Sequence, residues 1–126
     1  MNKKILWIAS SLLAIAVIAL VFISFKKEAT FSDTSGIILF YGNGCPHCAN
    51  VDKYIKENDV ESKVEFTHAE VYLNKGNANL MVSLQEKCGL PKESIGGIPF
   101  LWNGADSTCL SGDVDIINFF NEKIDG

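Results

Sequence analysis

A Cys-Pro-His-Cys tetrapeptide at positions 45–48 constrains the fold of this chain more than any other feature. It follows an apolar run over 36–41 that is typical of a buried strand, and it precedes an amphipathic stretch over 49–56 that predicts a helix. Two thiols at this spacing, at the start of a helix, can close a disulfide and reopen it. The sequence therefore predicts a strand, a short loop and a helix built around a redox pair.

Residues 1–27 are predicted to form a signal anchor that stays attached to the chain. Ile5 to Phe25 runs for 21 residues without a charge, which as a helix is long enough to cross a hydrocarbon core of about 30 Å. A cleaved signal peptide is expected to have a shorter apolar core and a small-residue cleavage site. The flanking lysines favour the N-terminus inside. We expect a single-pass membrane protein with a tether at 28–35 and an extracytoplasmic domain at 36–126.

The charge and cysteine content of the predicted domain narrow its partners. From Phe31 onward, 14 Asp and Glu face seven Lys and no Arg, so nucleic acid is not an expected partner. Four cysteines in an exported domain favour disulfides over resting thiols. Outside the motif, Cys88 and Cys109 could be buried thiols, a structural disulfide or a second redox pair. A structural disulfide is the favoured interpretation.

The remaining apolar patterns predict three more strands and two more helices. Alternating residues place the second strand over 64–72, and a turn is predicted at 74–77. A second helix carries Leu80, Leu84 and Cys88 on one face and ends at Gly89. Two strands over 98–102 and 107–111 form a hairpin through Asn-Gly at 103–104.

The last helix is predicted to begin after position 112. Ser111 and Asp113 are both candidates for its N-cap. Its inward face is predicted to carry the apolar residues Val114, Ile117, Phe120 and Ile124. The order of elements in the domain is then β-α-β-α-β-β-α, with the first two strands parallel and the last two antiparallel.

The position of the motif assigns different roles to its two cysteines. A helix N-terminus stabilises a thiolate, so Cys45 is predicted to be the nucleophile. Cys48 lies on the predicted buried face of the helix and would resolve the mixed disulfide, whereas Cys45 is expected to be accessible. Pro46 suits the first helical turn, and His47 adds an imidazole near the Cys45 sulfur. Both residues stabilise the reduced, thiolate form of the cysteine pair. A pair whose reduced form is stabilised is a stronger oxidant, so the motif favours donating disulfides.

The segment from Phe40 to Cys48 resembles the thioredoxin superfamily, in particular exported members such as bacterial periplasmic thiol oxidants that share Cys-Pro-His-Cys. The compact length is similar to that of glutaredoxins, and Gly-Ile-Pro at 97–99 resembles a second signature of the superfamily. The resemblance implies an α/β protein with a minimal thioredoxin-like fold, a four-stranded mixed sheet with helices on both faces. It also implies a cis proline at Pro99, with Ile98 and Pro99 binding substrate beside Tyr41. No metal or organic cofactor is expected.

Two positions depart from the patterns of the families that the chain resembles. Thioredoxins carry a buried Asp six residues before the motif, where this chain has Leu39. Glutaredoxins carry a basic residue just before the motif for glutathione, which is absent from 41–44. Gly112-Asp113 resembles the glutaredoxin step that receives a glutathione carboxylate, although helix capping would explain Asp113 equally well.

These features favour a membrane-anchored thiol-disulfide oxidoreductase that acts on protein thiols and is reset by a membrane redox partner, either a quinone-linked oxidase or an electron carrier. Two other classes stay open. One is a metal-binding protein, either a zinc site in which Cys88, Cys109, His47 or His68 would complete the motif, or an assembly factor whose cysteine pair carries copper or zinc to a partner. The other is a glutathione-dependent reductase. His68 itself is interpreted as a half-buried histidine on the face of Val64 and Phe66, without a role.

Overall fold

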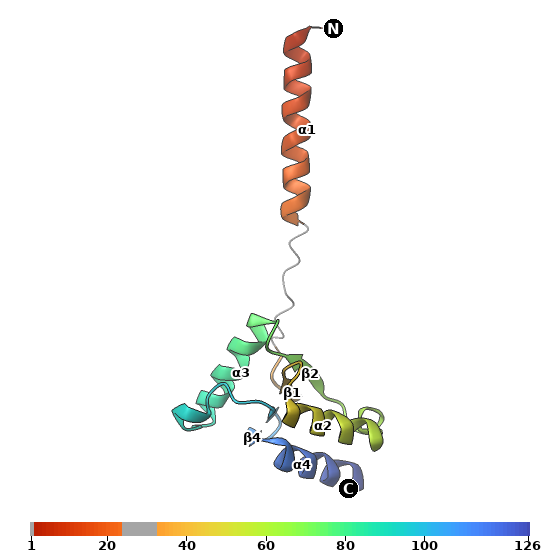
Figure 1. Ribbon diagram of the computed structural model, residues 1–126, viewed down its shortest axis with the longest axis vertical. Helices are drawn as coiled ribbons and strands as arrows, with labels where there is room; N and C mark the ends of the chain where they lie inside the picture. The colour runs from red at the N-terminus through yellow and green to blue at the C-terminus, as the bar shows by residue number, and fades with distance from the viewer. Residues whose placement is uncertain (1, 24–32) are drawn as a thin grey trace.

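The computed structural model describes residues 2–23 and 33–126. A first helix, α1, spans Lys3–Ile23, and the sheet and the other helices follow from residue 33 onward (Figure 1). Within these two described ranges, no helix is both long enough and apolar enough to cross a membrane. The end of the predicted anchor and part of the predicted tether, at 24–32, lie outside the described residues.

Four strands form one mixed sheet in the order β2-β1-β3-β4. β1 is parallel to β2, while β3 is antiparallel to both β1 and β4. A parallel pair needs a crossover connection, which here contains α2. The elements are β1 (Ile37–Tyr41), α2 (Pro46–Glu57), η1 (Val60–Ser62), β2 (Thr67–Glu70), α3 (Lys75–Lys87), η2 (Lys92–Ser94), β3 (Phe100–Asn103), β4 (Thr108–Ser111) and α4 (Asp113–Asp125). This is the predicted β-α-β-α-β-β-α order, with two short 3-10 helices added.

Helices cover both faces of the sheet, with α3 on one face and α2 and α4 on the other (Figure 1). Neighbouring residues of β1 point to opposite faces, so Ile38 and Phe40 pack under α3 while Leu39 packs under α2 and α4. Burying a large apolar side chain stabilises a fold by about 1.5–3 kcal/mol. The two clusters thereby hold α2 and α3 firmly against the strand that leads into the cysteine pair.

The third helix starts earlier than its sequence pattern indicates. Residues 74–77 are predicted as a turn, but Asn74 is the N-cap of α3 and its Oδ1 accepts from the Asn77 N–H at 3.0 Å. Asn is common in turns and equally common at N-caps, because its side chain accepts from a backbone N–H two or three residues on. The predicted turn is therefore the first turn of α3.

The second strand is shorter than predicted and begins at Thr67. Residues 60–64 are turned instead, because the Lys63 and Val64 N–H groups both donate to the Val60 carbonyl. Val64 and Phe66 still reach the core on the α2 side, although they precede β2. Their alternation with polar residues indicated burial correctly and strand structure wrongly.

The inward face and the cap of α4 also differ from the prediction. Val114 is 66% exposed, whereas Ile116 is fully buried with Phe120. Of the four residues predicted to face inward, Phe120 is buried and Ile117 and Ile124 pack against the same cluster, so only Val114 is wrong. The N-cap is Gly112, at φ 92°, and no side chain caps the helix. Neither Ser111 nor Asp113 is therefore its N-cap.

The hairpin strands also begin later than the apolar runs that predict them. β3 starts at Phe100 and β4 at Thr108, with a turn at 104–107 between them. Pro99 has no N–H to donate to a strand partner, which explains why the ladder does not include it. All four residues of β3 are buried, so this strand forms the centre of the sheet together with β1.

Candidate active site

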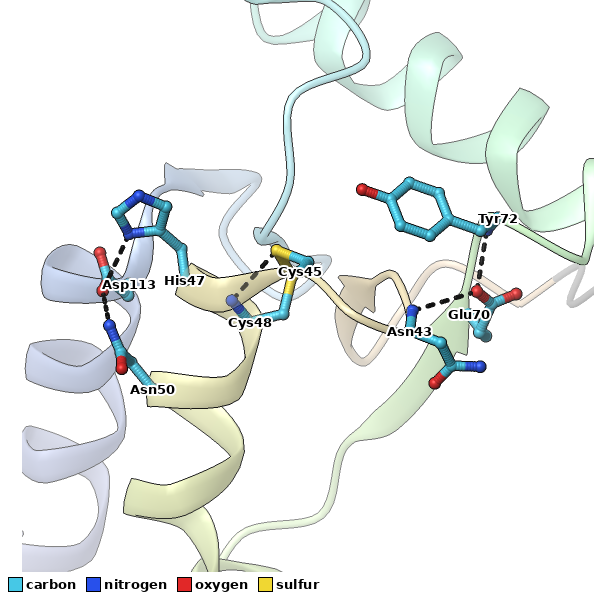
Figure 2. The surroundings of a disulfide bond; sticks show 8 residues. All are labelled: Asn43, Cys45, His47, Cys48, Asn50, Glu70, Tyr72 and Asp113. Carbon is cyan, nitrogen blue, oxygen red and sulfur yellow. Dashed lines mark hydrogen bonds and ion pairs between the residues drawn. A yellow bond between two sulfur atoms is a disulfide. The ribbon is translucent and has the colours of Figure 1, made fainter.

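Cys45 and Cys48 form a disulfide at the N-terminus of α2 (Figure 2). Cys45 is the N-cap residue, with extended backbone, and its Sγ accepts from the Cys48 N–H at 3.2 Å. Pro46 is the first helical residue, where the missing N–H would have no partner in the helix. The sulfur of Cys45 thus occupies the place of a capping oxygen, where the unpaired N–H groups of the helix stabilise negative charge.

The two cysteines differ little in exposure. Cys45 is 9% exposed and Cys48 is 6% exposed. The expected burial of Cys48 is confirmed, whereas the expectation of an accessible Cys45 is wrong for the oxidised pair. Their asymmetry comes from position along the chain, because Cys45 precedes the helix and Cys48 lies within its first turn.

A cleft of about 430 Å³ lies beside the disulfide on the α2 side of the sheet. Tyr41 lines it, as expected for a residue of the substrate groove, and Leu39 forms part of its apolar wall. No carboxylate stands at position 39, so this wall offers Cys48 no proton acceptor there. The lining residues are Leu39, Tyr41, Gly42, Asn43, Gly44, Cys45, Pro46, Cys48, Ala49, Asp52 and His68.

The peptide bond between Ile98 and Pro99 is cis. Pro99 is fully buried, and its carbonyl accepts from the Gly112 N–H at 3.0 Å. Ile98 is half-buried, and its side chain lies so close to Gly42 that a Cβ there would stand 2.7 Å from it. The segment at 98–99 is therefore next to the loop that carries Cys45, and of its two side chains only that of Ile98 is partly accessible.

Gln85 anchors the segment that leads to Pro99, and nothing in the sequence analysis singled it out. Its side chain is fully buried in α3. The amide donates from Nε2 to the Gly97 carbonyl at 2.9 Å, and Oε1 accepts from the Gly96 N–H at 2.8 Å. A buried Gln whose amide oxygen and amide nitrogen both bond to one loop holds that loop in place. A polar residue on an otherwise apolar helix stripe is the only sequence signal for it.

Glu70 ties the active-site loop to the segment after β2 (Figure 2). Its carboxylate accepts from the N–H groups of Leu73 at 2.7 Å, Tyr72 at 2.9 Å and Asn43 at 3.5 Å. Desolvation raises the pKa of Glu70, but the backbone N–H donors outweigh it and hold the pKa below its ordinary value. Sequence reasoning missed Glu70, because its partners converge only in the folded chain.

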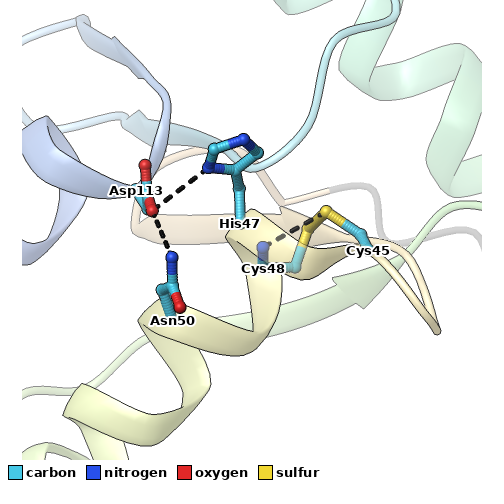
Figure 3. Close-up of polar contacts among 5 residues, drawn as sticks. All are labelled: Cys45, His47, Cys48, Asn50 and Asp113. Carbon is cyan, nitrogen blue, oxygen red and sulfur yellow. Dashed lines mark hydrogen bonds and ion pairs between the residues drawn. A yellow bond between two sulfur atoms is a disulfide. The ribbon is translucent and has the colours of Figure 1, made fainter.

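His47 points to the start of α4 and contacts Asp113 (Figure 3). Its Nδ1 lies 3.2 Å from Asp113 Oδ2, and the Asn50 amide donates to the same oxygen at 2.6 Å. The hydrogen bonds from Asn50 and from His47 hold the pKa of Asp113 below its ordinary value. The role expected of Asp113 as a helix cap is thus replaced by a contact with the active-site histidine.

Cys88 and Cys109 form the second disulfide. Cys88 is the C-cap residue of α3, and Cys109 lies in β4 opposite Trp102. Their Cα atoms are 6.3 Å apart, and both residues are half-buried against the core on the α3 side. This disulfide joins a helix end to an edge strand.

His68 lies on β2 beside Leu39 and lines the cleft. The rings of Tyr41 and Phe66 contact it edge-on, and Glu61 lies 3.6 Å from its Nδ1. Burial lowers the pKa of His68, although Glu61 acts in the opposite direction. The expected half-buried histidine is therefore present, next to the active site.

Within residues 2–23 and 33–126, no group of three or more His, Cys, Asp or Glu side chains is placed to hold a metal ion. No protein-family model matches the chain, and no curated protein matches its sequence. What stands is an α/β domain with a four-stranded mixed sheet and a Cys-x-x-Cys disulfide at a helix N-terminus, an arrangement compatible with a thioredoxin-like fold.

Proposed function

We propose that this domain is a thiol-disulfide oxidoreductase of the thioredoxin superfamily that exchanges disulfides with protein thiols through Cys45 and Cys48. The observation that carries the proposal is the position of Cys45. Its sulfur caps α2 and accepts a backbone N–H, and its disulfide partner lies one turn into the same helix. A thiolate at this point is stabilised, and it is both a nucleophile and a good leaving group.

The reaction has two exchange steps. In the oxidising direction, a substrate thiolate attacks Cys45 Sγ, the bond between the two sulfurs breaks, and Cys48 leaves as a thiolate. A second substrate thiol then attacks the mixed disulfide at the substrate sulfur, and Cys45 leaves as a thiolate stabilised by the helix N-terminus. The substrate gains a disulfide and the protein pair gains two electrons. In the reducing direction, Cys45 attacks first and Cys48 resolves.

Substrate contacts are assigned to the two sides of the disulfide. Tyr41 lines the cleft on one side, and Ile98 lies against Gly42 on the other. An extended peptide that crosses the disulfide would meet Ile98, which precedes the buried Pro99, the position at which the superfamily binds substrate backbone. Exposed Tyr72 and Leu73 add apolar surface beside the same loop.

The cellular setting is proposed from the sequence. An N-terminal signal anchor would hold the domain on the extracytoplasmic side, where disulfides persist, and a membrane redox protein would reset the pair. Fractionation of cells, followed by protease treatment of intact cells, tests this placement. A chain recovered only with cytosolic proteins would contradict it.

Two measurements test the proposed activity. The full chain should oxidise a peptide dithiol, or reduce a protein disulfide, and lose this activity when Cys45 is alkylated. Trapping with Cys48→Ala in cells should yield mixed disulfides with protein substrates, because the resolving thiol is absent. No exchange in either direction would reject the proposal. Activity confined to glutathionylated substrates would instead favour a glutaredoxin-type reductase.

A further inference from the structure

His47 is connected to the rest of the domain through one nitrogen of its ring. Nδ1 faces Asp113 Oδ2 at 3.2 Å. Because a carboxylate only accepts hydrogen bonds, Nδ1 must carry the proton in this contact. In the neutral ring, the other nitrogen, Nε2, then carries the lone pair. The side chain of His47 is 69% exposed, and Figure 3 shows Nε2 pointing away from Asp113 above the first turn of α2.

Asp113 is itself held in place from the helix that carries the cysteines. The Asn50 amide donates to Oδ2 at 2.6 Å, so this one oxygen receives N–H groups from two residues of α2. The Asp113 side chain is only 18% exposed. It lies in the first turn of α4 but is not its cap. Asp113 is therefore contacted from α2 by two residues, the active-site histidine His47 and Asn50, which lies one turn further along the helix.

We propose that His47 and Asp113 form an acid-base pair in which Asp113 fixes the Nδ1–H tautomer and His47 Nε2 takes the proton from an incoming substrate thiol. The inference rests on the proposed thiol-disulfide exchange. Asp113 is a positioning residue, since it acts through His47.

The proton and the electrons balance in this step. Nε2 takes the proton of the substrate thiol, and the resulting thiolate attacks Cys45 Sγ. The bond between Cys45 and Cys48 breaks, and its electron pair leaves with the Cys48 sulfur. In the reverse direction, the imidazolium returns the proton to the departing substrate thiolate. His47 is next to Cys48 and two residues from Cys45 in the chain, and its ring lies beside the first turn of α2, which carries the disulfide (Figure 3).

The tautomer of His47 is the most direct test. A long-range proton–nitrogen NMR spectrum of the full chain at pH 8, above the usual titration range of histidine, distinguishes the Nδ1–H from the Nε2–H form. We expect Nδ1–H in the wild type and a mixture or the Nε2–H form in Asp113→Ala. Asp115→Ala is the matched control, because Asp115 also lies in the first turn of α4 but is exposed. An unchanged tautomer in Asp113→Ala would overturn the proposal.

Exchange rates separate proton transfer from a merely structural bridge between α2 and α4. At pH 7, Asp113→Ala should oxidise a peptide thiol about three- to tenfold more slowly than the wild type. This loss is smaller than the usual effect of removing a general acid-base catalyst, because the His47 ring is exposed. Above about pH 9 its rate should approach the wild-type rate, because thiols ionise unaided near pH 8.5. Asp113→Glu should restore part of the loss, and Asp115→Ala should match the wild type.

Two further results complete the test. His47→Ala and the double variant His47→Ala/Asp113→Ala should react at the same rate, since Asp113 acts only through His47. A loss in Asp113→Ala that is equal at every pH, or that adds to the loss in His47→Ala, would overturn the pair and identify a structural bridge. A wild-type chain that exchanges no disulfides would overturn the proposed function as well, whereas the other outcomes leave that function intact.

Discussion

The two disulfides of this domain are built into the fold in opposite ways. Cys45 and Cys48 are three positions apart, at the start of one helix and beside an open cleft. Cys88 and Cys109 are 21 positions apart and join the end of α3 to an edge strand against the core. A longer loop loses more conformational entropy on closure, by about 0.6 kcal/mol for each doubling of its length. We therefore expect helix position to support exchange at the first disulfide, and loop length to make the second the more stabilising link.

Replacing the nucleophile should have the largest effect of any single change. Cys45→Ser removes the sulfur that forms the mixed disulfide, so exchange with a peptide dithiol should fall by on the order of a thousandfold or more. The free energy of unfolding should fall by no more than about 2 kcal/mol, less than for the second disulfide, because the disulfide that Cys45→Ser removes closes a shorter loop. Cys48→Ser should also stop turnover but still form mixed disulfides. Substantial turnover by Cys45→Ser would mean that another thiol reacts first.

Removing the second disulfide should have the reverse effect. The double variant Cys88→Ala/Cys109→Ala should lower the free energy of unfolding by about 3 kcal/mol, from the loop that the disulfide closes. Its exchange rate, measured well below its melting temperature, should stay within about twofold of wild type, since neither residue lines the cleft. Chemical denaturation measures the first quantity and peptide oxidation the second. Loss of exchange in the folded double variant would show that the pairs relay electrons.

The parts of the fold that local sequence determines were predictable. The strand over 36–41, Pro46 in the first helical turn and the buried face of α2 through Val51 and Ile55 all follow from residues close together in the chain. The element order followed from the same patterns. Boundaries failed where a residue suits two local structures, as Asn74 suits both a turn and an N-cap.

The parts of the site that depend on distant contacts were not predictable. Asp113 meets His47 and Asn50 across more than 60 positions, and Asn43 meets Glu70 across 27. A single sequence gives the residue types at these positions but not their partners. The prediction that Cys45 is exposed failed for a related reason. Helical position indicates which sulfur faces the core, but the folded chain buries the other cysteine as well.

Gln85 joins α3 to the loop at Gly96 and Gly97, and its replacement should affect both stability and exchange. Gln85→Leu removes the partners of the Gly96 N–H and the Gly97 carbonyl, so the free energy of unfolding should fall by about 2 kcal/mol. The freed loop carries Ile98, so the Michaelis constant for a peptide substrate should rise more than the turnover number falls. The exposed neighbour provides the control, since Glu86→Leu should change neither. Unchanged stability in Gln85→Leu would contradict the anchoring role.

Glu70 should have a smaller effect that depends on pH. Glu70→Gln weakens the acceptor for three backbone N–H groups, so stability at pH 7 should fall by about 1 kcal/mol. The folded state lowers the pKa of Glu70, so the stabilisation is complete above its unfolded value near 4.5 and is lost as pH falls through the lower folded value. Unfolding curves of both proteins from pH 7 to pH 3 should therefore converge at the acid end. A constant difference would contradict this assignment.

The most direct test is a redox titration that follows both disulfides in the same sample. The oxidised full chain is equilibrated with redox buffers of decreasing potential, alkylated and digested. Mass spectrometry of the peptides then shows which cysteines were reduced. Cys45–Cys48 should be reduced reversibly at a potential between about −120 and −270 mV, while Cys88–Cys109 should stay oxidised to below about −300 mV. Reduction of both disulfides at the same potential, or of Cys88–Cys109 first, would contradict the division between a redox pair and a structural link.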